Sequence, residues 1–130
     1  MIGPVIADTD LLIDFLRGKG AGVDAIRRRL KDGTLRFTAV TAFELRVGAD
    51  FLRRERTIAR LLAGRTLPLD VEAALHAGAI AADLGARGEP IGVADTLQAG
   101  IARRFGLPFA TRNTRHFGRV PGLQVESVGD

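Results

Sequence analysis

Short apolar runs alternate with longer helical patterns along the whole chain. The strand-like runs are residues 4–7, 35–39, 67–69, 107–111 and 123–126. Between them, apolar residues recur every three or four positions, as on one face of a helix, over residues 8–18, 22–31, 41–49, 51–64, 71–86 and 94–106. This alternation predicts an α/β fold with a mostly parallel central sheet.

Glycine and proline mark the ends of these segments. Pro68 lies in the short run 67–69, which suits an edge strand because proline cannot donate to a ladder. Residues 113–117 are expected to form a turn or a short helix. Ala74, Gly78 and Ala82 form a stripe of small residues, for packing in the core or against a second copy. With no linker, repeat or low-complexity segment, residues 1–130 are predicted to form a single domain.

Three carboxylates stand where an apolar run gives way to a helical pattern. Asp8 follows the run 4–7, Glu44 follows the segment 35–43, and Asp95 follows the segment 90–94. In a parallel sheet such junctions lie along one edge, so these side chains are expected to share one crevice. Clustered carboxylates resist ionising together, and a divalent cation with oxygen ligands relieves the repulsion. The pattern therefore predicts a nuclease that uses Mg²⁺, with Mn²⁺ as the alternative.

Each of these acids also has a purely structural interpretation. Asp8 suits a helix N-cap, a role that Thr9 or Asp10 can share. Thr41 and Glu44 match the spacing of a capping box. Asp95 is favourably placed near a helix N-terminus, although a buried acid among apolar neighbours needs a partner.

Several polar residues flank the three acids. Thr9, Asp10, Thr111 and Asn113 are candidates for contacts with metal-bound water or substrate, with a plain turn role as the alternative for Asn113. His116 is a candidate for substrate contact. Asp14 and His76 are expected to lie on the solvated surface.

The chain carries a net charge of +4, and of its 19 basic residues only Lys19 and Lys31 are lysines. Arginine suits bidentate contacts with phosphate, which nominates Arg112 and Arg115 for RNA-phosphate contacts; solvated helix faces explain the charge equally well. The absence of cysteine excludes disulfides, cysteine-based zinc sites and thiol nucleophiles. No apolar run is long enough to span a membrane and no signal pattern opens the chain, so we expect a cytoplasmic protein without a membrane partner.

Four motifs in series resemble those of PIN-domain proteins, and of the VapC toxins in particular. They are Asp8-Thr-Asp-Leu-Leu-Ile-Asp-Phe-Leu-Arg-Gly, Thr41-Ala-Phe-Glu44-Leu-Arg-Val-Gly, Ile91-Gly-Val-Ala-Asp95-Thr-Leu-Gln-Ala and Thr111-Arg-Asn113-Thr-Arg-His-Phe. The resemblance covers essentially the whole chain. Many relatives carry an aspartate or glutamate in the last motif, where this chain has Asn113 and His116, so no fourth acidic ligand is implied.

The resemblance implies a three-layer α/β/α fold and Mg²⁺ or Mn²⁺ held by Asp8, Glu44 and Asp95. It also implies an endoribonuclease acting as the toxin of a toxin–antitoxin pair. Such toxins are typically homodimers held inactive by a VapB-type antitoxin. The RNA target stays open among tRNA, rRNA and mRNA.

The sequence allows two other functional interpretations. Asp8-Thr-Asp10 also resembles the opening of haloacid-dehalogenase-type phosphatases, but that family needs a later lysine and none follows Lys31. A catalytically degenerate PIN-like module that binds RNA or a protein partner is the other alternative, and the missing fourth acid is its best support.

Overall fold

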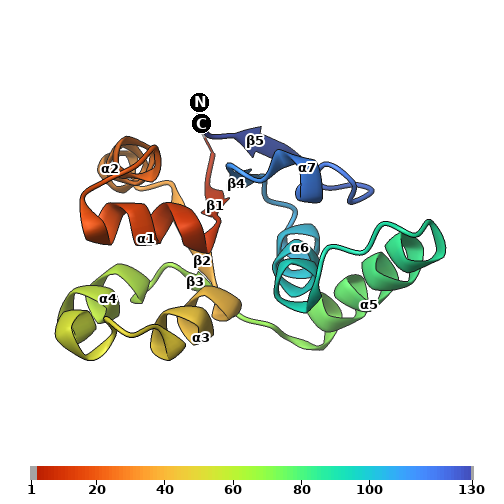
Figure 1. Ribbon diagram of the computed structural model, residues 1–130, viewed down its shortest axis with the longest axis horizontal. Helices are drawn as coiled ribbons and strands as arrows, with labels where there is room; N and C mark the ends of the chain where they lie inside the picture. The colour runs from red at the N-terminus through yellow and green to blue at the C-terminus, as the bar shows by residue number, and fades with distance from the viewer. Residues whose placement is uncertain (1–2, 130) are drawn as a thin grey trace.

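The computed structural model describes residues 3–129, which form a five-stranded sheet with helices on both faces (Figure 1). All neighbouring strands are parallel, in the order β3-β2-β1-β4-β5. The strands are β1 (Val5–Ala7), β2 (Leu35–Thr38), β3 (Thr66–Leu67), β4 (Phe109–Thr111) and β5 (Val125–Ser127). The predicted mostly parallel α/β fold is confirmed, and β3, next to Pro68, is an edge strand.

The helices include every segment for which a helix was predicted. They are α1 (Thr9–Arg17), α2 (Gly22–Asp32), α3 (Ala39–Val47), α4 (Glu55–Leu62), α5 (Val71–Ala86), α6 (Val93–Phe105) and α7 (Thr114–Phe117). The predicted helix 51–64 is split, because a 3-10 turn at Leu52–Arg54 precedes α4. None of the helices in the described part of the chain has the length and apolar character needed to cross a membrane.

Two apolar clusters pack against opposite faces of the sheet. Val5 and Ala7 of β1 point into a cluster with residues of α1, α2 and α4, whereas Ile6 points into a cluster with residues of α5, α6 and α7. All three β1 residues are therefore buried, as expected for a strand covered on both faces. This arrangement is the three-layer α/β/α sandwich that the resemblance implies, with its layers seen side by side in Figure 1.

Two local predictions were wrong. The helix α3 begins at Ala39, and its N-cap is Thr38, whose side chain accepts a hydrogen bond from the backbone N–H of Thr41. Thr41 is consequently a buried residue inside the helix, and the expected capping box with Glu44 does not form. The small-residue stripe at 74, 78 and 82 is exposed; the residues of α5 that pack in the core are Ala73, Ala77, Ile80 and Leu84.

Candidate active site

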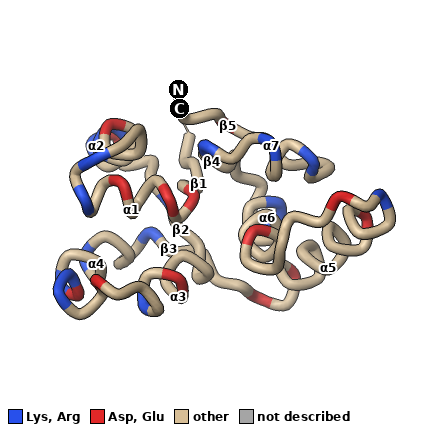
Figure 2. The backbone as a smooth tube through the Cα atoms, in the orientation of Figure 1, with Lys and Arg blue, Asp and Glu red and all other residues tan. Residues whose placement is uncertain are grey.

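The site lies at the edge of the sheet where the three central strands end. Asp8 directly follows β1, α3 directly follows β2, and the loop after β4 leads to Asn113. Acidic segments at the start of α1, in α3 and at the start of α6 gather around this end of β1 (Figure 2). The topology thus brings together acids that are far apart in the sequence.

The carboxylate of Asp8 is buried, with 7% of the residue exposed. Although Asp8 occupies the N-cap position of α1, its side chain makes no capping hydrogen bond. Its Oδ2 instead accepts a hydrogen bond of 2.7 Å from the Thr111 hydroxyl, and its Oδ1 accepts one of 3.3 Å from the side-chain amide of Gln98. The capping interpretation of Asp8 is therefore wrong, and Thr111 is engaged with this carboxylate.

Burial raises the pKa of Asp8 to about 6. The hydrogen bond from Thr111 opposes this rise, and the negative charges of Asp10 and Asp95 add to it. Burial likewise raises the pKa of Asp95, opposed by a hydrogen bond and a favourable charge interaction with His116 and aided by the charge of Asp10. The charge of Asp10 thus raises the pKa of both Asp8 and Asp95, so Asp10 lies near the site although it is itself exposed.

Asp95 lies in the first turn of α6 and faces His116 from α7. The His116 Nδ1 lies 3.4 Å from Asp95 Oδ2. His116 therefore lies in the candidate site, beside Asp95, one of the three acids predicted from the sequence. Asn113 has a structural role, because its Oδ1 accepts a hydrogen bond of 3.4 Å from the backbone N–H of His116 and caps α7.

Glu44 reaches the site through hydroxyl groups. The Thr9 hydroxyl lies 2.6 Å from Glu44 Oε1 and 2.8 Å from the Thr41 hydroxyl. The Thr41 hydroxyl is in turn 3.3 Å from Oε1 of Gln98. Thr9, a candidate for contact with water or substrate, is thus buried and engaged with Glu44.

Sequence reasoning missed Gln98, although a signal was present. Gln98 lies on the inner face of α6 between Ala94 and Ile101, where the helical pattern calls for an apolar residue. A polar side chain at such a position requires buried hydrogen-bond partners, and the structure supplies them.

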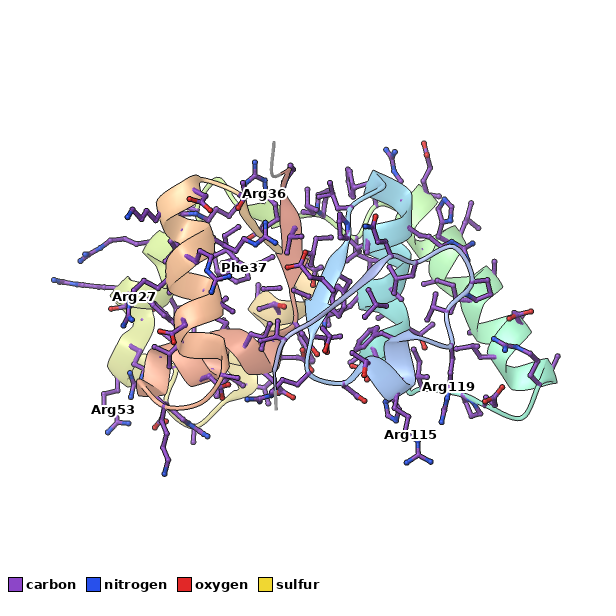
Figure 3. The ribbon with its side chains drawn as sticks, turned by 90° about the horizontal axis from the view of Figure 1, so that it is seen from above. Arg27, Arg36, Phe37, Arg53, Arg115 and Arg119 are labelled. Carbon is purple, nitrogen blue, oxygen red and sulfur yellow. The ribbon has the colours of Figure 1, made fainter. Side chains whose placement is uncertain are left out.

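Asp14 was expected to be solvated, but it is largely buried. Its carboxylate accepts a hydrogen bond of 3.0 Å from the backbone N–H of Gly22 and pairs with Arg112. Arg112, a candidate for RNA contact, therefore links the loop after β4 to α1. Arg115 extends from α7 away from the body of the protein (Figure 3).

The carboxylate oxygens of this site have the chemistry that a hard divalent cation requires. A neighbouring positive charge would favour the ionised form of both acids, because Asp8 is buried, Asp95 is partly buried, and the negative charge of Asp10 raises the pKa of each. Over residues 3–129, no three or more His, Cys, Asp or Glu side chains already surround one point at coordinating distance. The donor types fit such an ion, although, among the described residues, the side chains do not converge on one point in this arrangement.

Comparison with known proteins identifies the family of this chain. The PIN-domain family matches residues 5–123. The tRNA(fMet)-specific endonuclease VapC of Shigella flexneri is 36% identical over 124 residues, which cover 92% of this chain and 93% of that protein. The protein of the same name from Salmonella typhimurium is 35% identical over 127 residues, covering 92% of this chain and 93% of its own.

Solved structures of related proteins share the fold of this chain. The crystal structure of DNA-bound VapBC from Salmonella typhimurium contains a chain that is 32% identical, with a TM-score of 0.79 over 98% of this chain and 100% of that one. FitAcB from Neisseria gonorrhoeae is 27% identical, with a TM-score of 0.76 over 93% of this chain and 95% of its own. The chain therefore belongs to the PIN-domain family and, within it, to the VapC proteins.

Proposed function

We propose that this protein is a Mg²⁺-dependent endoribonuclease that acts as the toxin of a toxin–antitoxin pair. The observation that carries the proposal is that buried Asp8 and partly buried Asp95 lie near one another at the carboxyl edge of a parallel sheet, in a chain 36% identical to a VapC endonuclease. A divalent cation would offset the repulsion between these acids and would also serve phosphodiester hydrolysis.

Asp8, Asp95 and Glu44 would hold the ion, which is Mg²⁺ or Mn²⁺. Once bound, such an ion polarises a phosphodiester oxygen and lowers the pKa of a water molecule. The protein's own residues orient the ligands: Thr111 and Gln98 each hold one oxygen of Asp8, and Thr9 holds Glu44. Asp10 lies close enough to act electrostatically on both Asp8 and Asp95 and is the first candidate for an additional ligand.

The basic residues outside this site would bind the RNA backbone. Arg115 extends freely from α7, one residue before His116, which contacts Asp95. Arg112 is paired with Asp14 and would reach phosphate only by leaving that carboxylate. The names of the two VapC relatives make initiator tRNA the first substrate to test, with rRNA and mRNA as the other candidates. An RNA substrate also places the protein in the cytoplasm.

The proposed partners are a VapB-type antitoxin and a second copy of this chain. The structural relatives include VapBC complexes, which supports the antitoxin. Large apolar side chains are exposed on α3 and α5, which supports the homodimer: Phe43, Val47, Val71 and Leu75. Light scattering on the purified protein would test the dimer. We expect a small antitoxin gene next to the gene for this chain, and its co-expression would test the antitoxin by relief of toxicity.

The deciding experiment is cleavage of purified tRNA, rRNA and mRNA with added Mg²⁺ or Mn²⁺ and with EDTA. We expect cleavage of one RNA class that stops on addition of EDTA, and sequencing of the new ends would identify the site. A protein that binds RNA but cleaves none with either ion would instead be a degenerate PIN-like binding module. The absence of three preassembled ligands within residues 3–129, and His116 in the last motif, are the observations that favour this second candidate.

A further inference from the structure

Gln98 is a buried amide that sits between the acidic site and the hydroxyl groups of β2 and α3. Only 1% of this residue is exposed, so its side-chain amide has to form hydrogen bonds with protein groups instead of water. Its Nε2 donates to Asp8 Oδ1 at 3.3 Å, and its Oε1 lies 3.1 Å from the Thr38 hydroxyl. A buried amide with both ends engaged is fixed in position, because each lost hydrogen bond would leave an unpaired polar group.

The ionised state of Asp8 determines the orientation of this amide. Threonine hydroxyls donate or accept, so Thr38 tolerates either end of Gln98. An ionised carboxylate only accepts, and a flipped amide would place Oε1 against Asp8 Oδ1. Nε2 therefore faces Asp8.

Counting the hydroxyl protons shows how the rest of the network is arranged. Three threonine hydroxyls, those of Thr9, Thr38 and Thr41, take part in four contacts. Each hydroxyl has one proton, so with oxygens of Glu44 and Gln98 as the acceptors one contact has none. The longest of the four, at 3.3 Å between Thr41 and Gln98, is the one left without a proton. Thr41 then donates to Thr9, and Thr9 donates to Glu44, while Thr38 alone holds the Gln98 oxygen.

We propose that Gln98 is a positioning residue for Asp8: its amide holds one carboxylate oxygen and so fixes the carboxylate in the orientation that receives a divalent cation. This inference rests on the proposed metal-dependent function. Each oxygen of Asp8 accepts one hydrogen bond from protein and has further lone-pair capacity for a ligand. The same contact also lowers the pKa of Asp8 against the effect of burial.

The test replaces Gln98 by methionine, which keeps the length of the side chain and removes its hydrogen bonds. The control is Thr96→Val, a substitution in the same helix at a buried hydroxyl that donates to the backbone carbonyl of Gly92. Calorimetric titration with Mn²⁺ reads metal binding directly. Because loss of a group that orients a ligand weakens metal affinity by about 10- to 100-fold, we expect a loss of that size in Q98M and at most a twofold change in T96V. A folded Q98M protein that binds Mn²⁺ within threefold of the parent would overturn the proposal.

A second measurement needs neither metal nor the Gln98 variant. In the metal-free parent, the Gln98 side-chain amide protons should exchange slowly with solvent in NMR spectra, and Asp8→Ala should abolish this protection. Unchanged protection in D8A would overturn the proposal. If the parent binds no Mn²⁺ but D8A removes the protection, the metal-dependent function fails while the contact that positions Asp8 stands.

Discussion

Replacing Asp8 by asparagine is expected to stabilise the metal-free protein while it abolishes cleavage. Burial, aided by the charges of Asp10 and Asp95, raises the pKa of Asp8 from 3.8 to about 6. Between these two values the folded protein keeps a proton that the unfolded chain has released, so stability falls as the pH rises through this window. At neutral pH the loss from this one group amounts to about 3 kcal/mol.

Asparagine removes this pH dependence because it does not titrate. It keeps one oxygen for Gln98, and any poorer contact with Thr111 changes stability equally at every pH. The unfolding free energy of D8N relative to the parent should therefore grow by about 2 kcal/mol between pH 4 and pH 7. Urea unfolding with EDTA at several pH values measures this difference. Asp24→Asn is the matched control, because Asp24 is exposed and its pairing with Arg27 contributes little.

A difference between D8N and the parent that stays constant from pH 4 to pH 7 would refute the reasoning about burial. Saturating Mg²⁺ provides a second check on the same two proteins. Because a ligand that binds only the folded state stabilises it by mass action, Mg²⁺ should raise the stability of the parent and leave D8N nearly unchanged. Equal stabilisation of both would show that Asp8 is not a ligand.

Three further outcomes follow from the site. Asp95→Asn should abolish RNA cleavage in a gel assay with its urea transition preserved, and near-normal cleavage would remove Asp95 from the ligand set. Binding of RNA by this inactive variant should weaken steeply with salt, and Arg115→Ala should reduce the slope of log affinity against log salt by about 1, as for one lost phosphate contact; an unchanged slope would place Arg115 outside the interface. His116→Glu should tighten Mg²⁺ binding in calorimetry and destabilise the metal-free protein at pH 7, and weaker Mg²⁺ binding would contradict this.

The parts of the fold that were predictable are those governed by local periodicity. The apolar run at β1 is short and bounded by Asp8, and the pattern of Leu11, Leu12 and Phe15 has the spacing of a helix, so strand and helix were distinguishable. A parallel sheet then places strand ends along one edge, and Asp8 lies there as predicted. The segment 90–94 was wrongly taken as strand-like: in this described part of the chain no strand lies between α5 and α6, and Asp95 reaches the site from the first turn of α6. The resemblance to PIN domains supports the ligand roles of Asp8, Glu44 and Asp95, and these roles stay predictions.

The parts that were not predictable depend on contacts between distant segments. Asp14 is buried because Gly20 and Gly22 allow the chain to pass close to it: a Cβ on Gly20 would lie 2.6 Å from the Asp14 carboxyl carbon. Thr41 looked like a helix cap because its spacing to Glu44 fits one, yet Thr38 takes that role and leaves Thr41 inside the helix. Local spacing predicted a helix from Thr41, whereas the hydrogen bond that caps α3 is made by Thr38, three residues earlier.

His116 changes the balance of charge at this site. A fourth carboxylate in its place would add repulsion to Asp95, whereas the imidazole Nδ1, 3.4 Å from Asp95 Oδ2, lowers the pKa of that acid. Asp95 is therefore ionised more readily than burial alone would allow, while Asp8 relies on the amide of Gln98 and the hydroxyl of Thr111. The Thr111 hydroxyl, the Gln98 amide and the His116 imidazole thus favour the ionised form of these two acids. In a site built only of carboxylates, a bound cation would have to provide all of this stabilisation. For the proposed metal-dependent function, it follows that metal removal should abolish activity well before it unfolds the chain.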